Sequence, residues 1–139
     1  MVAELAMRAM MILARRHGEG PIRLHDICAE RSMSRDYLAK ILGNLARVDL
    51  VTPVRGKHGG YKLARRPEQI TVLEVIEAIE GPLALNLCQH DPPRCEEYDC
   101  KLRPVWRELQ EAVTERFGRL TLAACVAETD SGQTDAAPD

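Results

Sequence analysis

The sequence SRDYLAKILGNLARVDLVTPVRGKHGGYKLA, residues 34–64, decides the fold class. Ser34 is a favoured N-cap residue, and the apolar residues after it recur at steps of three and four as far as about Val48, which predicts an amphipathic helix. Residues 50–55 and 61–64 favour strands, and the three glycines between them permit the positive backbone angles of a hairpin loop. The stretch therefore predicts a helix followed by a β-hairpin.

The residues before this stretch supply two more helices. Residues 3–16 are rich in Ala, Met and Leu on most faces, which predicts a largely buried helix ended by His17 and Gly18. A short helix follows over residues 24–30 and is broken at residues 31–33. Two helices joined by a short turn form a helix-turn-helix, and a hairpin directly after it is a wing. The predicted fold is mainly α, a winged helix-turn-helix domain over residues 1–81.

The residues after the wing predict a further helix, a loop and a long helix. Residues 70–79 form an amphipathic pattern that Gly81 and Pro82 end, and residues 82–100 read as a cysteine-containing loop. An apolar stripe of about six turns then follows at helical spacing, made of Leu102, Val105, Trp106, Leu109, Val113, Phe117, Leu120 and Ala124. We expect one dimerisation helix over residues 101–127 and a disordered tail over 128–139.

The long helix needs a partner for its stripe, because little of so small a domain is left to cover it. The same helix of a second copy would do so and give a homodimer. The alternative is that the helix packs back along its own domain.

Length and charge narrow the class of protein. With 139 residues the chain fits one ordinary domain, which excludes a large two-domain enzyme. The net charge of -2 conceals an asymmetry: residues 1–66 hold 13 basic and 6 acidic side chains, whereas the remainder holds 6 basic and 15 acidic ones. A basic portion joined to an acidic one is typical of nucleic-acid binding, although chance clustering on a solvated surface gives the same count.

The chain shows no membrane segment or export signal. Its apolar runs fall short of the ~18 residues that a membrane span requires, and the N-terminal run is interrupted by Glu4 and Arg8. We therefore expect a cytoplasmic protein whose five cysteines stay reduced.

The exposed face of the second helix of a helix-turn-helix reads base edges in the major groove. Double-stranded DNA is therefore the expected partner, and the residues expected to contact it are Ser34, Arg35, Tyr37 and Lys40 on the helix and Arg55, Lys57 and His58 on the wing. A half-buried packing role for Tyr37 and a merely solvated hairpin are the alternatives.

Three of the cysteines are grouped. Cys88, Cys95 and Cys100 lie within one short stretch, and thiolates suit iron-sulfur clusters or zinc. The spacing is not that of a zinc ribbon, so both a metal site and a set of redox-active thiols remain open. Cys28 and Cys125 fit buried, structural positions.

The wing motif RGKHGGYKLAR at residues 55–65, the segment from Pro67 to Gly81 and the three-cysteine loop together resemble the bacterial winged-helix regulators that include IscR, NsrR and RirA. The similarity covers roughly residues 2–127. It implies a homodimeric transcription factor, usually a repressor and not an enzyme. It also implies an iron-sulfur cluster, of the two-iron or the four-iron type, on Cys88, Cys95 and Cys100.

The resemblance also bears on the fourth cluster ligand. IscR has a histidine three residues after the last cysteine, but this chain has Arg103 there. In the NsrR-like branch a carboxylate of the first helix of the other subunit is the ligand, and Glu4 matches it. The preferred ligand set is Glu4 of one chain with the three cysteines of the other. The alternative is that Glu4 is no ligand and its negative charge only stabilises the N-terminal end of the helix.

These expectations combine into one hypothesis: operator affinity is controlled by a cluster that senses nitric oxide, redox state or iron. A regulator of the same fold that senses oxidants through its thiols, without a cluster, is the first alternative. A dimeric iron-sulfur carrier or small redox enzyme is the second.

Overall fold

Helix α1 (Val2–Arg15) lies at the centre of the N-terminal body in the computed structural model, which describes residues 2–131. Its alanines let other elements approach closely, and Ala6, Ala9 and Met10 are completely buried. The remaining elements are α2 (Leu24–Arg31), α3 (Arg35–Arg47), β1 (Val51–Val54), β2 (Gly60–Leu63), η1 (Pro67–Gln69), α4 (Val72–Glu80), η2 (Leu87–Gln89), α5 (Arg103–Arg119) and α6 (Leu122–Ser131). The prediction of a mainly helical winged fold is confirmed.

Helices α2 and α3 form the helix-turn-helix. Helix α2 ends at Ser32, whose left-handed backbone (φ 52°) turns the chain toward the next helix. Ser34 occupies the N-cap position of α3 as predicted, and its carbonyl accepts the Leu38 N–H at 2.9 Å, but its side chain makes no capping hydrogen bond. One face of α3 is buried through Leu38, Ile41, Leu42 and Leu45. The opposite face is left to solvent.

Strands β1 and β2 form an antiparallel hairpin, the wing, in which Val51 pairs with Leu63 and Val54 with Gly60. The chain before α2 adds one further bridge, in which the N–H groups of Ile22 and Tyr61 each donate to the other residue's carbonyl at 2.8 Å. A glycine is required at position 60, because its φ is 156° and a Cβ there would lie 2.2 Å from the Ile22 carbonyl oxygen. The wing is thus fixed to the body at its base.

The prediction of one long helix over residues 101–127 is wrong in one respect, because the observed helix breaks at Leu120. The backbone there is extended, and residues 120–122 run beside the start of α4: Val72 N–H donates to the Leu120 carbonyl at 2.8 Å, and Leu122 N–H to the Ile70 carbonyl at 2.9 Å. Leu122 is completely buried in the core. These contacts replace the helical hydrogen bonds that a continuous helix would make.

Helix α6 then packs against α1, so this part of the chain follows the alternative in which the helix returns to its own domain. Because α6 reaches Ser131, residues 128–131 of the expected disordered tail are helical. The rest of that tail, residues 132–139, lies outside the described residues.

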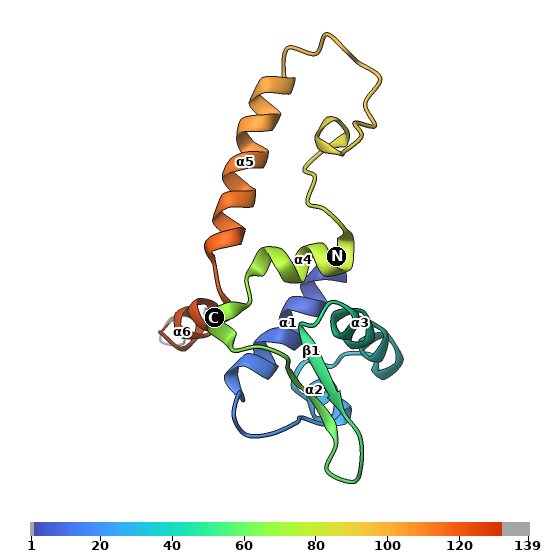
Figure 1. Ribbon diagram of the computed structural model, residues 1–139, viewed down its shortest axis with the longest axis vertical. Helices are drawn as coiled ribbons and strands as arrows, with labels where there is room; N and C mark the ends of the chain where they lie inside the picture. Colours follow the sequence, from blue (N-terminus) through green and yellow to red (C-terminus); the bar gives the residue numbers. More distant parts are fainter. Residues whose placement is uncertain (1, 132–139) are drawn as a thin grey trace, which may run out of the picture.

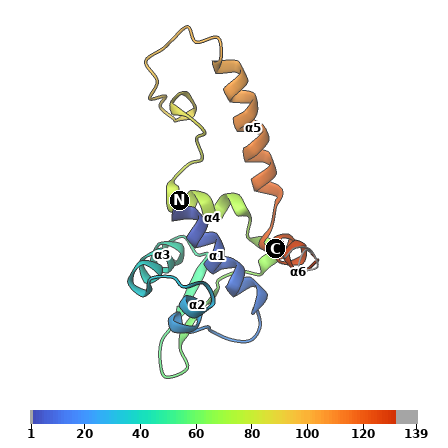
Figure 2. The same ribbon diagram turned by 180° about the vertical axis from the view of Figure 1, so that it is seen from behind.

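Helix α5 projects from the body as an arm that carries the cysteine loop at its far end. Figures 1 and 2 agree that this loop and the tip of the wing lie at opposite ends of the molecule. Within residues 2–131, no helix is long and apolar enough to cross a membrane.

Candidate DNA-binding surface and cysteine loop

The start of α3 presents the polar residues that the sequence predicted for base reading. Ser34, Arg35 and Lys40 are exposed, and Tyr37 has 38% of its surface exposed. They lie at the N-terminal end of α3, outside the buried face that Leu38, Ile41, Leu42 and Leu45 turn toward the core. Exposed polar residues at the start of the second helix are what a recognition helix requires.

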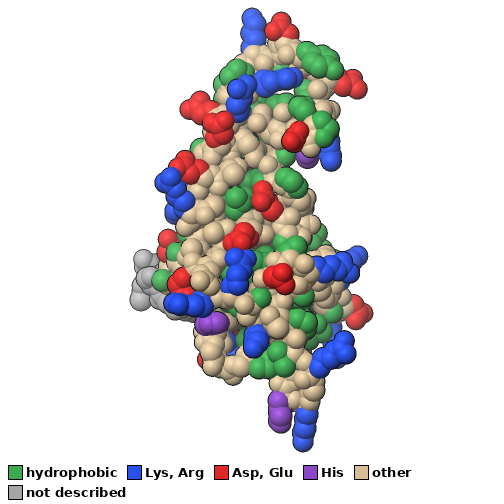
Figure 3. Space-filling view, in the orientation of Figure 1, with side chains coloured by type: hydrophobic (Ala, Val, Ile, Leu, Met, Phe, Trp, Pro, Cys, Tyr) green, Lys and Arg blue, Asp and Glu red, His purple; other side chains and the backbone are tan. Residues whose placement is uncertain are grey.

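The wing tip carries the second predicted group. Arg55, Lys57 and His58 are exposed on the loop between β1 and β2. Figure 3 shows basic and histidine side chains at this end of the molecule. Gly56 has a φ of 111°, a backbone conformation that favours glycine in the turn at the tip.

A groove brings together Arg35 of the first group and Arg55 and Lys57 of the second, whereas Ser34, Tyr37, Lys40 and His58 lie outside it. It has a volume of about 480 Å³ and lies between the starts of α2 and α3 and the wing. Five of its lining residues are basic or histidine: Arg23, His25, Arg35, Arg55 and Lys57. So many cationic groups around an open groove suit the phosphates of a DNA strand.

The sequence analysis missed Arg23 and His25. Arg23 precedes α2, and its Nη2 donates to the Lys57 carbonyl oxygen at 3.3 Å, so one guanidinium joins the helix-turn-helix to the wing. The first helix of a helix-turn-helix crosses the DNA backbone, and basic residues at its start were the available clue.

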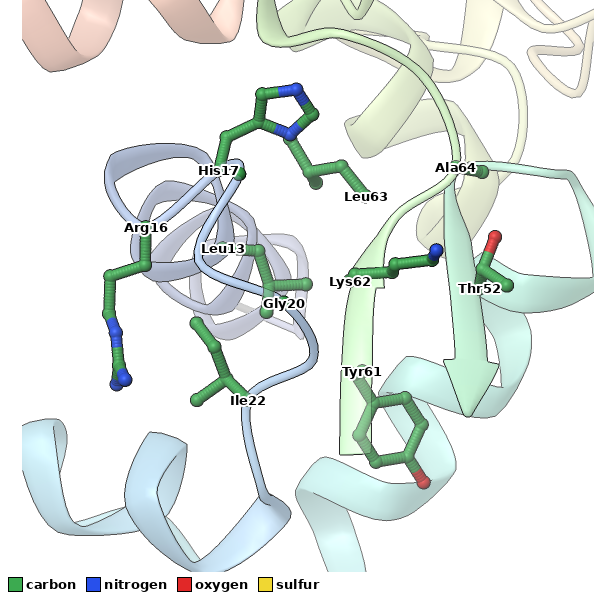
Figure 4. Close-up of a pocket in the computed structure, with 11 residues that line it drawn as sticks. Leu13, Arg16, His17, Gly20, Ile22, Thr52, Tyr61, Lys62, Leu63 and Ala64 are labelled. Carbon is green, nitrogen blue, oxygen red and sulfur yellow. The ribbon is translucent and has the colours of Figure 1, made fainter. Parts of the chain in front are cut away.

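A second cavity, of about 460 Å³, lies between the end of α1 and the base of the wing (Figure 4). Its charged side chains do not converge: Lys62 extends toward Thr52, whereas Arg16 points away from the strands. Arg16 is paired instead with Glu19 and Glu30, at 3.1 Å and 3.8 Å. The cavity therefore does not resemble a ligand site built from convergent polar groups.

The three clustered cysteines share the loop between α4 and α5, all half-buried and free. The Cys88 thiol donates to Asn86 Oδ1 and accepts from Gln89 Nε2, both at 3.2 Å. The loop is closed on itself where the Arg94 N–H donates to the Leu87 carbonyl at 2.9 Å. The donor chemistry thus fits a cluster, since three thiols are available on one segment.

The single chain does not gather a complete ligand set. Glu4 is exposed on α1 and pairs with Arg8, not with the cysteines. Among residues 2–131, no three histidine, cysteine or acidic side chains lie close enough together to hold a metal ion.

The other two cysteines lie elsewhere. Cys28 packs against the core from α2. Burial raises the pKa of the Cys125 thiol on α6, the Glu128 carboxylate raises it further, and the opposing effect of Arg116 is smaller. Cys28 and Cys125 are half-buried, not fully buried as expected.

The apolar stripe of α5 is left open to solvent over its first half. Leu102, Val105, Trp106 and Leu109 have 60%, 51%, 37% and 46% of their surface exposed, and α5 contributes no buried residue to the described structure. Such a row of large apolar side chains is typical of an interaction face.

Comparison with known proteins agrees with this arrangement. The family model Rrf2, described as an iron-dependent transcriptional regulator, matches residues 2–128. The chain belongs to the Rrf2 family. Among its Rrf2 relatives, CymR of Bacillus subtilis is 32% identical over 125 residues, which cover 89% of this chain and 86% of CymR. IscR of Xenorhabdus nematophila is 35% identical over 122 residues, covering 87% and 74%.

Solved Rrf2 structures have the same fold. The structure of CymR, the global cysteine regulator of B. subtilis, matches with a TM-score of 0.81 at 30% identity, covering 94% of this chain and 96% of that chain. T. potens IscR matches with a TM-score of 0.79 at 29% identity, covering 99% and 91%.

The family places the chain among transcriptional regulators, which are DNA-binding proteins and not enzymes. The prediction of a winged-helix regulator related to IscR is confirmed. Because the relatives include both IscR and a cysteine regulator, family membership does not by itself fix the signal.

Proposed function

We propose that this Rrf2 regulator is a homodimeric repressor whose operator affinity depends on an iron-sulfur cluster held by the cysteine loop. The observation that carries the proposal is the position of Cys88, Cys95 and Cys100: three free, half-buried thiols lie on one loop, directly before the helix with the open apolar stripe. Ligand binding and subunit contact would therefore involve the same helix.

The DNA-binding part of the proposal rests on the groove between α2, α3 and the wing. Arg35 and Lys40 would donate to base edges from α3, with Ser34 and Tyr37 on phosphates. Arg55, Lys57 and His58 would contact the backbone or the minor groove from the wing, and Arg23 and His25 would extend this contact. A dimer would present two such surfaces to two half-sites.

The dimer part rests on α5. Leu102, Val105, Trp106 and Leu109 of one copy would cover the same residues of the other, which removes four large apolar side chains from water. In such a regulator, working in the reducing cytoplasm, the loop thiols would stay free for a ligand.

The cluster part rests on the donor set. Cys88, Cys95 and Cys100 would supply three thiolates, and Glu4 of the partner subunit would supply the fourth ligand. Because Glu4 lies at the start of α1, this ligand would link the loop of one subunit to the DNA-binding body of the other. A bound cluster supplies a group that nitric oxide, oxidants or iron shortage can destroy, and its loss would release this link.

The test is anaerobic purification with iron and sulfide analysis and visible spectroscopy. We expect the wild type to show iron, sulfide and visible absorbance, and Cys95→Ala to lose that absorbance while the dimer persists. Glu4→Ala should weaken cluster retention. A Cys125→Ala variant is the matched control and should keep the absorbance.

A thiol-based sensor of the same fold is the second candidate, because the three loop thiols are free and the related CymR of Staphylococcus aureus has been solved in an oxidized form. Wild-type protein that contains no iron but loses free thiols and changes DNA affinity on mild oxidation would establish this candidate and refute the cluster.

A further inference from the structure

One side chain of α5 holds the segment that leads from α4 to the first cysteine of the loop. Gln110 Nε2 donates to the Leu83 carbonyl oxygen at 2.5 Å, and Gln110 Oε1 accepts the Leu85 N–H at 2.8 Å. The same Nε2 also donates to Thr114 Oγ1 at 3.3 Å, one helical turn further along. Both polar atoms of the amide are therefore used, and two of the three bonds go to the backbone at the start of the loop, before its first cysteine.

The geometry explains why an amide suits this position. In an extended segment, the carbonyl of one residue and the N–H two residues later point to the same side. A primary amide offers a donor and an acceptor side by side, so it can pair with both groups as a neighbouring strand would. A carboxylate offers no donor and an aliphatic side chain offers neither group.

We infer that Gln110 is a positioning residue for the cysteine loop: it fixes the backbone of residues 83–85 against α5 and so determines the place of Cys88. This inference rests on the proposed function in that the loop is taken as the sensor. Cys88 follows Leu85 by three residues, and its thiol contacts Asn86 and Gln89, so little chain separates the fixed point from the sulfur.

The far end of the loop is attached to the same helix. The Arg103 N–H donates to the Cys100 carbonyl at 3.1 Å, and Arg103 Nη2 donates to the Glu97 carbonyl at 2.5 Å. Gln110 and Arg103 thus hold the two ends of the loop on α5. A change in the spacing of the three sulfurs would therefore have to occur between two attachment points on the same helix.

The first test uses cluster-free protein and Gln110→Ala. Alanine is the best helix former, so α5 remains intact. We expect hydrogen exchange at the Leu85 amide to become about ten-fold faster, in line with the loss of one or two ordinary hydrogen bonds. Alkylation of Cys88 should accelerate by a similar factor, while Cys28 and Cys125 in the same molecule react as in the wild type. Exchange and alkylation at wild-type rates would overturn the inference.

Glu111→Ala is the matched control, because residue 111 is exposed on the next position of α5. It should leave Leu85 exchange and Cys88 alkylation unchanged. An acceleration equal to that of Gln110→Ala would show a general weakening of α5 and would overturn the inference.

The second test uses Gln110→Glu and a pH series. The ionised carboxylate has no donor for the Leu83 carbonyl, and repulsion between the two oxygens would move residues 83–85 away from α5 and expose the Leu85 amide, whereas the protonated acid has a donor again. Leu85 exchange, expressed relative to wild type at each pH, should be accelerated at neutral pH and return toward wild type in acid. A ratio that does not change with pH would contradict a role for the paired hydrogen bonds.

These readouts separate the inference from the proposed function, because they need no cluster. If wild-type protein never binds iron, the cluster proposal fails while the exchange and alkylation results still decide the role of Gln110. If the wild type does bind a cluster, Gln110→Ala should also change its visible circular dichroism, and an unchanged spectrum would count against the inference.

Discussion

The guanidinium of Arg65 lies 2.8 Å from the carboxylate of Glu74, which joins the residue after the wing to the first turn of α4. Arg65 also donates to the Gln69 carbonyl at 3.1 Å. Glu74 completes a capping box with Thr71, whose backbone N–H it accepts at 2.9 Å. The wing and α4 are therefore linked through one carboxylate, next to the bridge that fixes the end of α5.

The link predicts a pH dependence of stability. Burial alone raises the pKa of Glu74, but the hydrogen bond from the Thr71 backbone and the Arg65 guanidinium together hold it below the ordinary value of 4.5. The stabilisation is present above that ordinary value and is lost as the pH falls through the lowered pKa of the folded state. Glu74→Gln should cost about 0.5–1 kcal/mol at pH 7, and the difference should shrink at an acidic pH below the ordinary value of 4.5.

Urea unfolding of both proteins at the two pH values measures this difference. Glu68→Gln is the control, because the pair of Glu68 with Arg66 is 3.5 Å long and its two side chains are 60% and 72% exposed. It should change the unfolding free energy by much less. Equal effects of the two substitutions would mean that the capping position of Glu74 is unimportant.

The wing tip predicts a salt-dependent loss of DNA binding. Lys57→Ala removes one exposed cation from the groove and should weaken binding to all duplexes alike, with the log-log slope of affinity against salt smaller by about 1. Fluorescence anisotropy with a duplex selected from a random pool, at several salt concentrations, measures the slope. Lys101→Ala makes the same change of charge on the cysteine-loop side and should leave the slope as it is.

The bond from Arg23 to the Lys57 carbonyl predicts two separable effects. Arg23→Lys keeps the positive charge but loses the guanidinium that spans from α2 to the wing, so affinity should fall at an unchanged salt slope. Arg23→Ala loses the charge as well, so the slope should also fall. Slopes and affinities equal to those of the wild type in both variants would show that Arg23 acts neither on the wing nor on a phosphate.

The open stripe of α5 predicts that a charge at its centre disrupts the dimer without unfolding the chain. Leu109 is 46% exposed in the single chain, so Leu109→Glu should preserve the helical circular dichroism. The molar mass by light scattering should fall from twice 15.5 kDa to 15.5 kDa. Arg107 is also exposed but lies off the stripe, so Arg107→Glu should remain dimeric. A dimeric Leu109→Glu would place the interface elsewhere.

The helix-turn-helix and wing could be predicted because their determinants are local. The spacing of Leu38, Ile41, Leu42 and Leu45 specifies the buried face of α3, and the glycines at 56 and 60 specify the hairpin. The break at Leu120 could not be predicted in this way, because apolar residues continue at helical spacing through it. It arises from hydrogen bonds to residues 70 and 72, about fifty positions earlier in the chain.

The candidate site shows the same difference between local patterns and contacts across the fold. The exposed residues of α3 and the wing tip follow from amphipathicity and turn chemistry, whereas Arg23 reaches the wing only because folding brings it to a carbonyl 34 positions away. Gln110 is a comparable case, because no sequence pattern distinguishes it from other polar residues on a helix. Its contacts with residues 83 and 85 form only because α5 runs back beside the start of the loop.

Local patterns along the chain were enough to predict most of the elements, their order and the available side-chain chemistry: a basic exposed helix, a glycine-rich wing and three neighbouring thiols. The tertiary structure alone decided where α5 ends, which basic groups share one groove and which side chain holds the cysteine loop. The difference arises from the distance along the chain over which each kind of interaction acts. Periodicity and turn preferences act over a few residues, whereas backbone pairing and side-chain contacts across the fold depend on packing that no local pattern encodes.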